Sequence, residues 1–131
     1  MERTAVNPVT WSLDMGFNQG EVVSGQTRTL YISGQTAMNQ DGRPEHDGDV
    51  AAQLALAVDN LEAVLAEAGM TLSNLVRLNV YTTDVDALFP HYGVLAGRLG
   101  TAGVAPTTTM LGVSRLAIPG QTVELEGTAV E

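Results

Sequence analysis

Apolar side chains recur with helical spacing through one long stretch of the chain. Between residues 50 and 69 they fall at positions i, i+4, i+7 and i+11, which places them on one stripe of an α-helix. Asp49 is a good N-cap for this helix, and Gly69 is a residue type that commonly ends one. The pattern therefore predicts an amphipathic helix over residues 50–69, whose apolar stripe consists of Leu54, Val58, Leu61 and Leu65.

A second helical pattern covers residues 86–99 and is followed by Gly100. Pro90 would lie in the first turn of this helix, where the missing backbone N–H has no helical partner to lose. The apolar face of the predicted helix consists of Leu88, Tyr92, Leu95 and Leu99.

Alternation of apolar and polar residues predicts strands in the second half of the chain. Residues 76–81 alternate in this way, as expected for a strand with one face on the core. Two more strands are predicted over residues 107–113 and 122–130, with residues 118–120 as the loop between them.

The N-terminal part carries shorter runs that favour strands. Residues 21–23 and 29–32 are predicted to form a hairpin through residues 24–28, and residues 1–20 to wrap over the surface before it. Residues 39–49 are almost all turn formers and charged residues, so they are predicted to form a loop. The resulting order, β-β-α-β-α-β-β, places two helices on one face of a mixed sheet and predicts an α+β fold.

The length and composition predict a single domain over residues 1–131 with its own core. Apolar residues make up 44% of the chain and charged residues only 16%, which is few for a soluble monomer. Two explanations remain open. Other subunits cover part of the surface, or the high alanine and glycine content lowers the charged fraction.

Missing residue types and the net charge exclude several classes of function. The chain has no cysteine, which excludes a disulfide, a thiol nucleophile and a thiolate metal site. It also has no lysine, which excludes catalysis through a lysine Schiff base. A net charge of −9 repels phosphate backbones and argues against nucleic acid as a main partner.

The sequence gives no sign of membrane insertion or export. No segment is apolar and long enough to span a bilayer, and no basic segment followed by an apolar one opens the chain. We therefore expect a soluble cytoplasmic protein without a membrane partner.

Several short segments stand in a specific order along nearly the whole chain. Near the C-terminus, residues 106–116 (Pro-Thr-Thr-Thr-Met-Leu-Gly-Val-Ser-Arg-Leu) lead to residues 123–126 (Val-Glu-Leu-Glu). Upstream lie residues 31–35 (Tyr-Ile-Ser-Gly-Gln), the helical run 53–69 and the strand 75–84. In this order and spacing, the segments resemble the Rid (YjgF-like) family of reactive-intermediate deaminases. The resemblance implies a chorismate-mutase-like fold and a trimeric barrel assembly with a small-molecule pocket at each subunit boundary.

One position departs from the family pattern. Thr108 stands where the family has a signature arginine, which is taken to bind the carboxylate of a small imine or enamine acid. A guanidinium forms two parallel charge-assisted hydrogen bonds to a carboxylate, and a threonine hydroxyl cannot. The chain therefore resembles a divergent branch of the family with an altered substrate. Without the resemblance, Thr108 needs no further explanation, because it lies in a β-branched run that any strand favours.

The resemblance implies a catalytic role for Glu124, the family's general acid/base position at the start of the last strand. A carboxylate in a partly desolvated cleft can position a water for attack on a C=N bond. From alternation alone, Glu124 and Glu126 would instead form the solvent-exposed face of an edge strand.

Other pocket positions also follow from the resemblance. Phe17 replaces a pocket tyrosine of many members, and Tyr92 lies near a position often held by a small polar residue. Ser33 and Gly34 could present a hydroxyl and a close backbone approach, or merely end a strand at a tight bend. With Thr108, these residues predict a binding pocket that is less charged and more aromatic than is usual in the family.

The remaining candidate groups do not point to a metal or a cofactor. His46 stands alone in an acidic loop, which favours a solvated charged segment over a metal site, and His91 is expected on the surface. Arg115 is expected to serve the surface or an interface rather than to replace the missing arginine. No phosphate-binding glycine loop, Gly-x-Ser-x-Gly elbow or metalloprotease motif is present, and we expect no cofactor.

Three functions follow from these observations. The first is an imine or enamine deaminase with an altered substrate, acting through Glu124. The second is a non-catalytic homotrimer that binds a small metabolite or regulates a partner. The third is RNA cleavage, an older label of the family, which the net charge of −9 disfavours.

Overall fold

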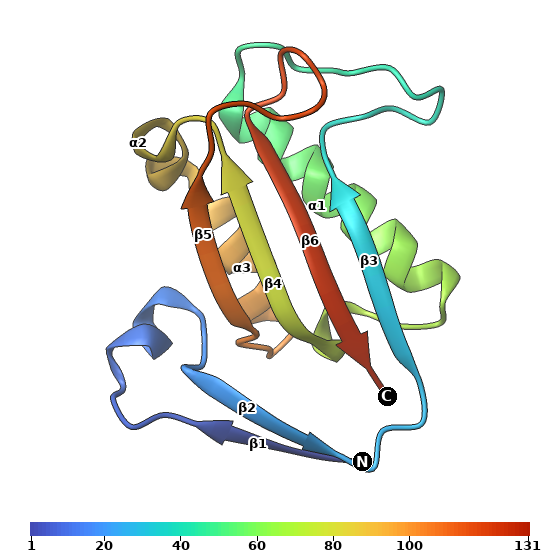
Figure 1. Ribbon diagram of the computed structural model, residues 1–131, viewed down its shortest axis with the longest axis vertical. Helices are drawn as coiled ribbons and strands as arrows, with labels where there is room; N and C mark the ends of the chain where they lie inside the picture. The colour runs from blue at the N-terminus through green and yellow to red at the C-terminus, as the bar shows by residue number, and fades with distance from the viewer.

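The computed structural model describes residues 1–131 and consists of a sheet with helices on one face (Figure 1). Four strands form this sheet in the order β3-β6-β4-β5, and two more form a separate ribbon. The strands are β1 (Glu2–Val6), β2 (Gly20–Ser24), β3 (Thr29–Gln35), β4 (Leu75–Thr82), β5 (Thr107–Gly112) and β6 (Val123–Val130). The helices are α1 (Val50–Glu67), α2 (Val85–Leu88) and α3 (Gly93–Thr101), with 3-10 turns η1 (Trp11–Met15), η2 (Leu72–Asn74) and η3 (Phe89–His91).

The first predicted helix is confirmed as α1. The carboxylate of Asp49 accepts a hydrogen bond from the backbone N–H of Ala52 at 3.0 Å, which satisfies one of the free amides of the first turn. Gly69 follows the helix with a φ of 76°, a left-handed conformation that favours glycine. The four residues of the predicted stripe are fully buried against the sheet. No helix in the structure is both long and apolar enough to cross a lipid bilayer.

The second predicted helix is present but broken, so its prediction as one continuous element was wrong. α2 ends at Leu88, η3 follows, and α3 begins at Gly93. Pro90 lies in η3, where its missing N–H and fixed ring do not allow the α-helical ladder to continue. Leu88, Leu95 and Leu99 are nevertheless buried as predicted. α3 packs behind the sheet, and α2 lies at its edge, by the ends of β4 and β5 (Figure 1).

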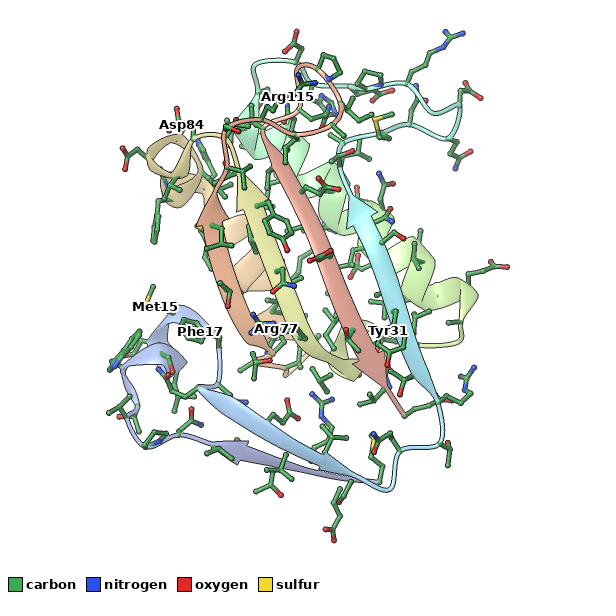
Figure 2. The ribbon with its side chains drawn as sticks, viewed as in Figure 1. Met15, Phe17, Tyr31, Arg77, Asp84 and Arg115 are labelled. Atoms are coloured by element: carbon green, nitrogen blue, oxygen red, sulfur yellow. The ribbon has the colours of Figure 1, made fainter.

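The sheet is mixed, as predicted. β4 pairs with β5 in parallel and with β6 antiparallel, and β3 pairs with β6 antiparallel. On β4, Leu78 and Val80 are buried under the helices. The alternate residues face the opposite side, called the open face below because no helix covers it; Arg77 and Tyr31 both lie on it (Figure 2). The α+β fold class is therefore confirmed.

The prediction that residues 21–23 and 29–32 pair as a hairpin was wrong. β2 pairs with β1, from Glu2 opposite Ser24 to Val6 opposite Gly20, and β3 instead pairs with β6. Residues 1–20, predicted to be irregular, thus contain a strand. The guanidinium of Arg3 donates to the carboxylate of Glu21 at 2.5 Å and to the carbonyl of Leu75 at 2.8 Å. These contacts attach the ribbon of β1 and β2 to the start of β4. The short strand-forming runs in the sequence do not indicate which strand each of them pairs with.

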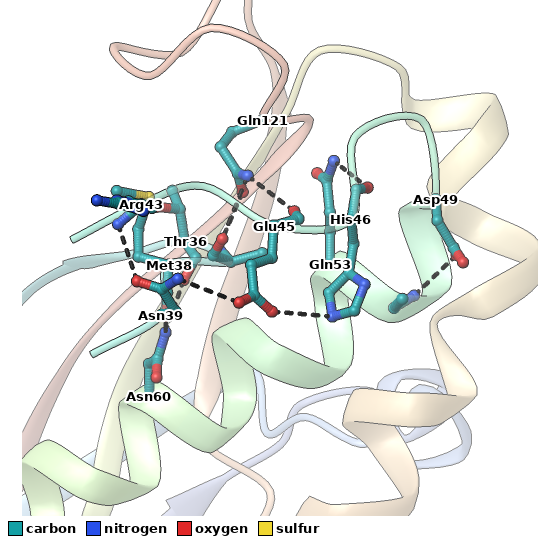
Figure 3. A network of polar contacts seen from close by, with 12 residues as sticks. Thr36, Met38, Asn39, Arg43, Glu45, His46, Asp49, Gln53, Asn60 and Gln121 are labelled. Atoms are coloured by element: carbon teal, nitrogen blue, oxygen red, sulfur yellow. Dashed lines mark hydrogen bonds and ion pairs between the residues drawn. The ribbon is translucent and has the colours of Figure 1, made fainter. Parts of the chain in front are cut away.

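The predicted loop over residues 39–49 is confirmed, and buried side-chain amides hold it in place (Figure 3). Gln53 donates to the carbonyls of His46 at 3.0 Å and Gly120 at 2.9 Å. The amide oxygen of Gln121 accepts the backbone N–H of Ala37 at 2.9 Å. Asn60 donates to two further backbone carbonyls, those of Thr36 and Met38. These side-chain hydrogen bonds take the place of the backbone hydrogen bonds that a helix or strand would provide, because buried backbone groups require partners.

Candidate functional site

The site residues predicted from the sequence fall into two groups on opposite faces of the sheet. In β6, Val123 and Leu125 point to the helices, so Glu124 points to the open face. In β5, Thr108 is the register partner of the buried Leu78, so its side chain is on the helix-facing side. Within one chain, Glu124 and Thr108 therefore do not share a pocket.

The helix-facing group belongs to a cavity of about 300 Å³, called the aromatic cleft below. It lies between the N-terminal segment, the region of α2 and η3, and β5. Phe17, Tyr92 and Thr108 come together here, as the sequence predicted for a substrate-binding pocket. The lining residues are Trp11, Met15, Phe17, Val85, Phe89, Tyr92, Thr108 and Met110.

Two aromatic pairs form the walls of the aromatic cleft. Trp11 and Phe17 meet edge to face, with ring centroids 6.0 Å apart and an interplanar angle of 84°. Phe89 and Tyr92 form a tilted pair with centroids 6.5 Å apart. Such pairs hold each other's orientation and add about 0.5–1.5 kcal/mol beyond the buried area. The two pairs therefore fix the relative orientation of the rings that line the cleft.

The aromatic cleft contains no charged side chain. The Thr108 hydroxyl donates a hydrogen bond to the carbonyl of Pro106 at 2.8 Å, so its proton is already engaged. Burial raises the pKa of the Tyr92 hydroxyl, which stays protonated at neutral pH. Tyr92 makes no side-chain hydrogen bond, and its hydroxyl is the one in the cleft that is free to donate.

The second group of predicted residues lies on the open face around Glu124. Between Ile32 and Gln35 the pairing of β3 with β6 shifts register, which is a bulge containing Ser33 and Gly34. A Cβ atom added to Gly34 would lie 1.8 Å from the Oε1 of Glu124. The carboxylate of Glu124 therefore lies directly over the backbone of Gly34, and this position exists only because glycine has no side chain. Ser33 is exposed beside it.

The two glutamates of β6 differ in what they contact. Glu126 accepts hydrogen bonds from the hydroxyl of Tyr81 and from the side-chain amide of Asn79, the latter at 3.0 Å. The hydrogen bond to Glu126 raises the pKa of the Tyr81 hydroxyl. Glu124, half-buried on the same face, receives no hydrogen bond from the protein. Of these two carboxylates, only Glu124 has no hydrogen-bond partner within the protein.

None of the six arginines lines the aromatic cleft. The guanidinium of Arg77 is on the open face and donates to the hydroxyl of Thr109 at 2.7 Å. Arg115 is exposed in the loop after β5, at the opposite end of the sheet from Phe17 (Figure 2). The placement of Arg115 agrees with its predicted role as a surface residue, and no other arginine takes the place of the one missing at Thr108.

Neither histidine lines the aromatic cleft or donates a hydrogen bond to Glu124. His46 is exposed in the loop before α1, with its Nε2 3.8 Å from the carboxylate of Glu45. His91 is exposed in η3. No three histidine, aspartate or glutamate side chains lie close enough together to hold a metal ion.

The sequence missed five of the eight residues that line the aromatic cleft. Trp11, Met15, Val85, Phe89 and Met110 line it but were not predicted as site residues. Their positions follow no common period because they come from segments far apart in the chain. The only available signal was the single tryptophan in a segment otherwise predicted to wrap over the surface.

Comparison with known proteins gives consistent similarities over most of the chain. The family model described as endoribonuclease L-PSP matches residues 14–131. The chain is 32% identical over 117 residues to the RutC family protein YjgH of Escherichia coli K12, covering 89% of this chain and 88% of that protein. It is 29% identical over 106 residues to 2-iminobutanoate/2-iminopropanoate deaminase of Rattus norvegicus, covering 79% and 74%. The crystal structure of YyfB from Yersinia pestis, a conserved Rid-family protein of unknown function, matches with a TM-score of 0.84 and 32% identity over 100% of both chains.

Proposed function

Because the chain belongs to the endoribonuclease L-PSP family, which includes the Rid and YjgF-like proteins, we propose that it hydrolyses a reactive imine or enamine. A relative of this chain is named as a deaminase of two such imines. The observation that carries the proposal is the carboxylate of Glu124, which is half-buried, free of hydrogen bonds and held over Gly34.

In the proposed reaction, Glu124 acts as general base and then as general acid. Its carboxylate accepts a proton from water while the water oxygen forms a bond to the imine carbon. The proton then passes to the nitrogen and gives a carbinolamine. Glu124 next takes the hydroxyl proton of this intermediate and delivers it to the nitrogen as the C–N bond breaks, which releases a carbonyl compound and ammonia. A positioned carboxylate of this kind contributes typically about 10²–10⁴-fold to the rate.

We further propose a homotrimer in which Glu124 of one chain faces the aromatic cleft of its neighbour. Within a single chain the two lie on opposite faces of the sheet, so one ligand cannot contact both. Most of the exposed large apolar side chains also gather in the N-terminal segment; they include Trp11 at 59% and Val22 at 58%. Apolar clustering of this kind marks surfaces that other chains cover.

The substrate of the proposed deaminase differs from a small imino acid. Hydrogen bonds to charged groups contribute about 1.5–3 kcal/mol each, and an arginine would donate two of them to a carboxylate, whereas Thr108 has a single hydroxyl and no positive charge. The Thr108 hydroxyl is moreover bonded to Pro106. Small anionic imines are therefore expected to be hydrolysed more slowly than uncharged ones.

A second candidate function, ligand binding without turnover, is favoured by the aromatic cleft. That cleft is complete without Glu124. Cleavage of RNA is disfavoured, because the net charge is −9 and Arg3, Arg28 and Arg98 are engaged in ion pairs with carboxylates.

The proposal is tested by generating imines in the presence of the protein and following the release of ammonia. An amino-acid oxidase supplies 2-iminopropanoate and 2-iminobutanoate, and a flavin amine oxidase supplies the uncharged imine of 2-phenylethylamine. We expect acceleration above the spontaneous rate for at least one of them. The absence of any acceleration would favour the binding function.

Replacing Gly34 by alanine is expected to lower imine hydrolysis by about 10- to 100-fold, because small displacements of a catalytic group are costly. The new Cβ would occupy the space of the Glu124 carboxylate and push it aside. Stability should change little, because the end of a glutamate side chain can move. Initial rates and thermal unfolding measure the two effects.

Gly97→Ala is the matched control, because a Cβ there meets nothing within 4 Å. It is expected to leave the rate unchanged and to stabilise α3 by up to about 1 kcal/mol. Unchanged activity in Gly34→Ala would show that the position of Glu124 over Gly34 is not needed.

A further inference from the structure

We propose that the aromatic cleft binds an uncharged aromatic or branched aliphatic group that carries a hydrogen-bond acceptor, and that Tyr92 donates the hydrogen bond that selects it. The inference rests on the proposed function in one respect, namely that the bound group is part of the imine substrate. Binding itself depends on the cleft alone.

The shape and surface of the cleft favour a flat or branched apolar group. Seven of its eight lining residues are hydrophobic, and its volume is about 300 Å³. This volume is at the lower end of the range for small-molecule pockets, which suits one ring with a short substituent. Met15 and Met110 add flexible thioethers that adapt to the edge of a ring.

The absence of charge in the cleft excludes an anionic group there. No arginine, lysine or histidine lines it, and the Thr108 hydroxyl already donates to Pro106. A carboxylate placed in the cleft would lose its hydration without gaining a cationic partner, which is strongly unfavourable. The preference for an uncharged group therefore follows from the lining residues.

Tyr92 supplies the free hydroxyl of the cleft. Its ring packs against Phe89 and is half-buried, while its hydroxyl makes no side-chain hydrogen bond. Because burial raises the pKa of this hydroxyl, it is a neutral donor throughout the physiological range. A carbonyl oxygen or an imine nitrogen is the acceptor that such a donor recognises.

The test uses two unreactive probes, phenylacetamide and phenylacetate, which share a ring and differ in charge. Trp11 is the only tryptophan of the chain and lines the cleft, so its fluorescence reports occupancy, with calorimetry as the second measurement. Phenylacetamide is expected to bind at least about ten-fold more tightly at neutral pH, because the carboxylate of phenylacetate would lose its hydration in the cleft without gaining a cationic partner. Equal or tighter binding of phenylacetate, or no saturable binding of either probe, would overturn the inference.

Two variants locate the effect in the cleft. Tyr92→Phe keeps the ring and is expected to weaken phenylacetamide about five- to ten-fold, as for one lost hydrogen bond. Thr108→Arg is expected to reverse the preference in favour of phenylacetate. Thr101→Arg adds the same charge at the exposed end of α3, outside the cleft, and should change neither affinity. Unchanged binding in Tyr92→Phe would remove Tyr92 from the inference.

Failure of the inference and failure of the proposed function give different results. Selective binding of phenylacetamide without hydrolysis of any imine would support the cleft as a binding site and contradict the deaminase. Hydrolysis of imines by a protein that prefers phenylacetate would support the deaminase and overturn the inference.

Discussion

Replacing Glu124 by glutamine is expected to lower kcat/KM for imine hydrolysis by about 10²–10⁴-fold, the usual contribution of general acid–base catalysis. The amide keeps the shape of the side chain but cannot accept a proton from water. Because Glu124 makes no hydrogen bond within the protein, its loss should not disturb the fold. Ammonia release at matched protein concentration gives the rate, and thermal unfolding checks the stability.

Glu126→Gln is the matched control on the same strand and the same face. Glu126 accepts hydrogen bonds from Tyr81 and Asn79, so its replacement is expected to affect local structure more than the rate. Similar rate losses in both variants would contradict the distinct role of Glu124. Full activity in Glu124→Gln would rule out general base catalysis by this residue.

The second large effect is expected from Gln53→Leu, which should lower the free energy of unfolding by about 3–4 kcal/mol. Gln53 is fully buried, and its amide group contacts two carbonyls, those of His46 and Gly120. Its oxygen accepts both the backbone N–H and the hydroxyl of Thr122, at 2.8 and 2.7 Å. Leucine has a similar size but would leave these part-buried groups without their partner. Urea unfolding measures the change.

Gln40→Leu is the control in the same region, because Gln40 is exposed and makes no side-chain hydrogen bond. Its effect should stay within about 0.5 kcal/mol. If both variants have the same stability, the amide of Gln53 does not hold the loop before α1. A changed denaturant slope in Gln53→Leu would indicate that the loop opens before the rest of the protein unfolds.

Features set by neighbours in the chain could be predicted from the sequence. The cap of α1 joins Asp49 to Ala52, three residues away, and the buried stripe of α1 repeats with the period of the helix itself. The alternation in β4 and β6 likewise gave their buried faces correctly. The family resemblance in addition identified Glu124 and Gly34, but not that their atoms are in contact.

Features set by distant segments could not be predicted. The ribbon of β1 and β2 is held by Arg3 at the start of β4, and nothing in the local sequence of β2 distinguishes β1 from β3 as its partner. The break of the helix at Pro90 was not predicted. A proline in the first turn of a long helix and a proline between two short helices leave the same spacing of apolar residues.

The sequence by itself determined the α+β class, the extents of α1 and the central strands, the family, and the absence of a carboxylate-binding arginine at Thr108. These depend on residue type and short-range spacing, which the backbone geometry converts directly into structure. Only the tertiary structure decided that Trp11 and Phe89 complete the aromatic cleft and that Glu124 lies on the opposite face from Thr108. Contacts between remote segments depend on how whole helices and strands pack, and the spacing of residues along the chain does not indicate this packing.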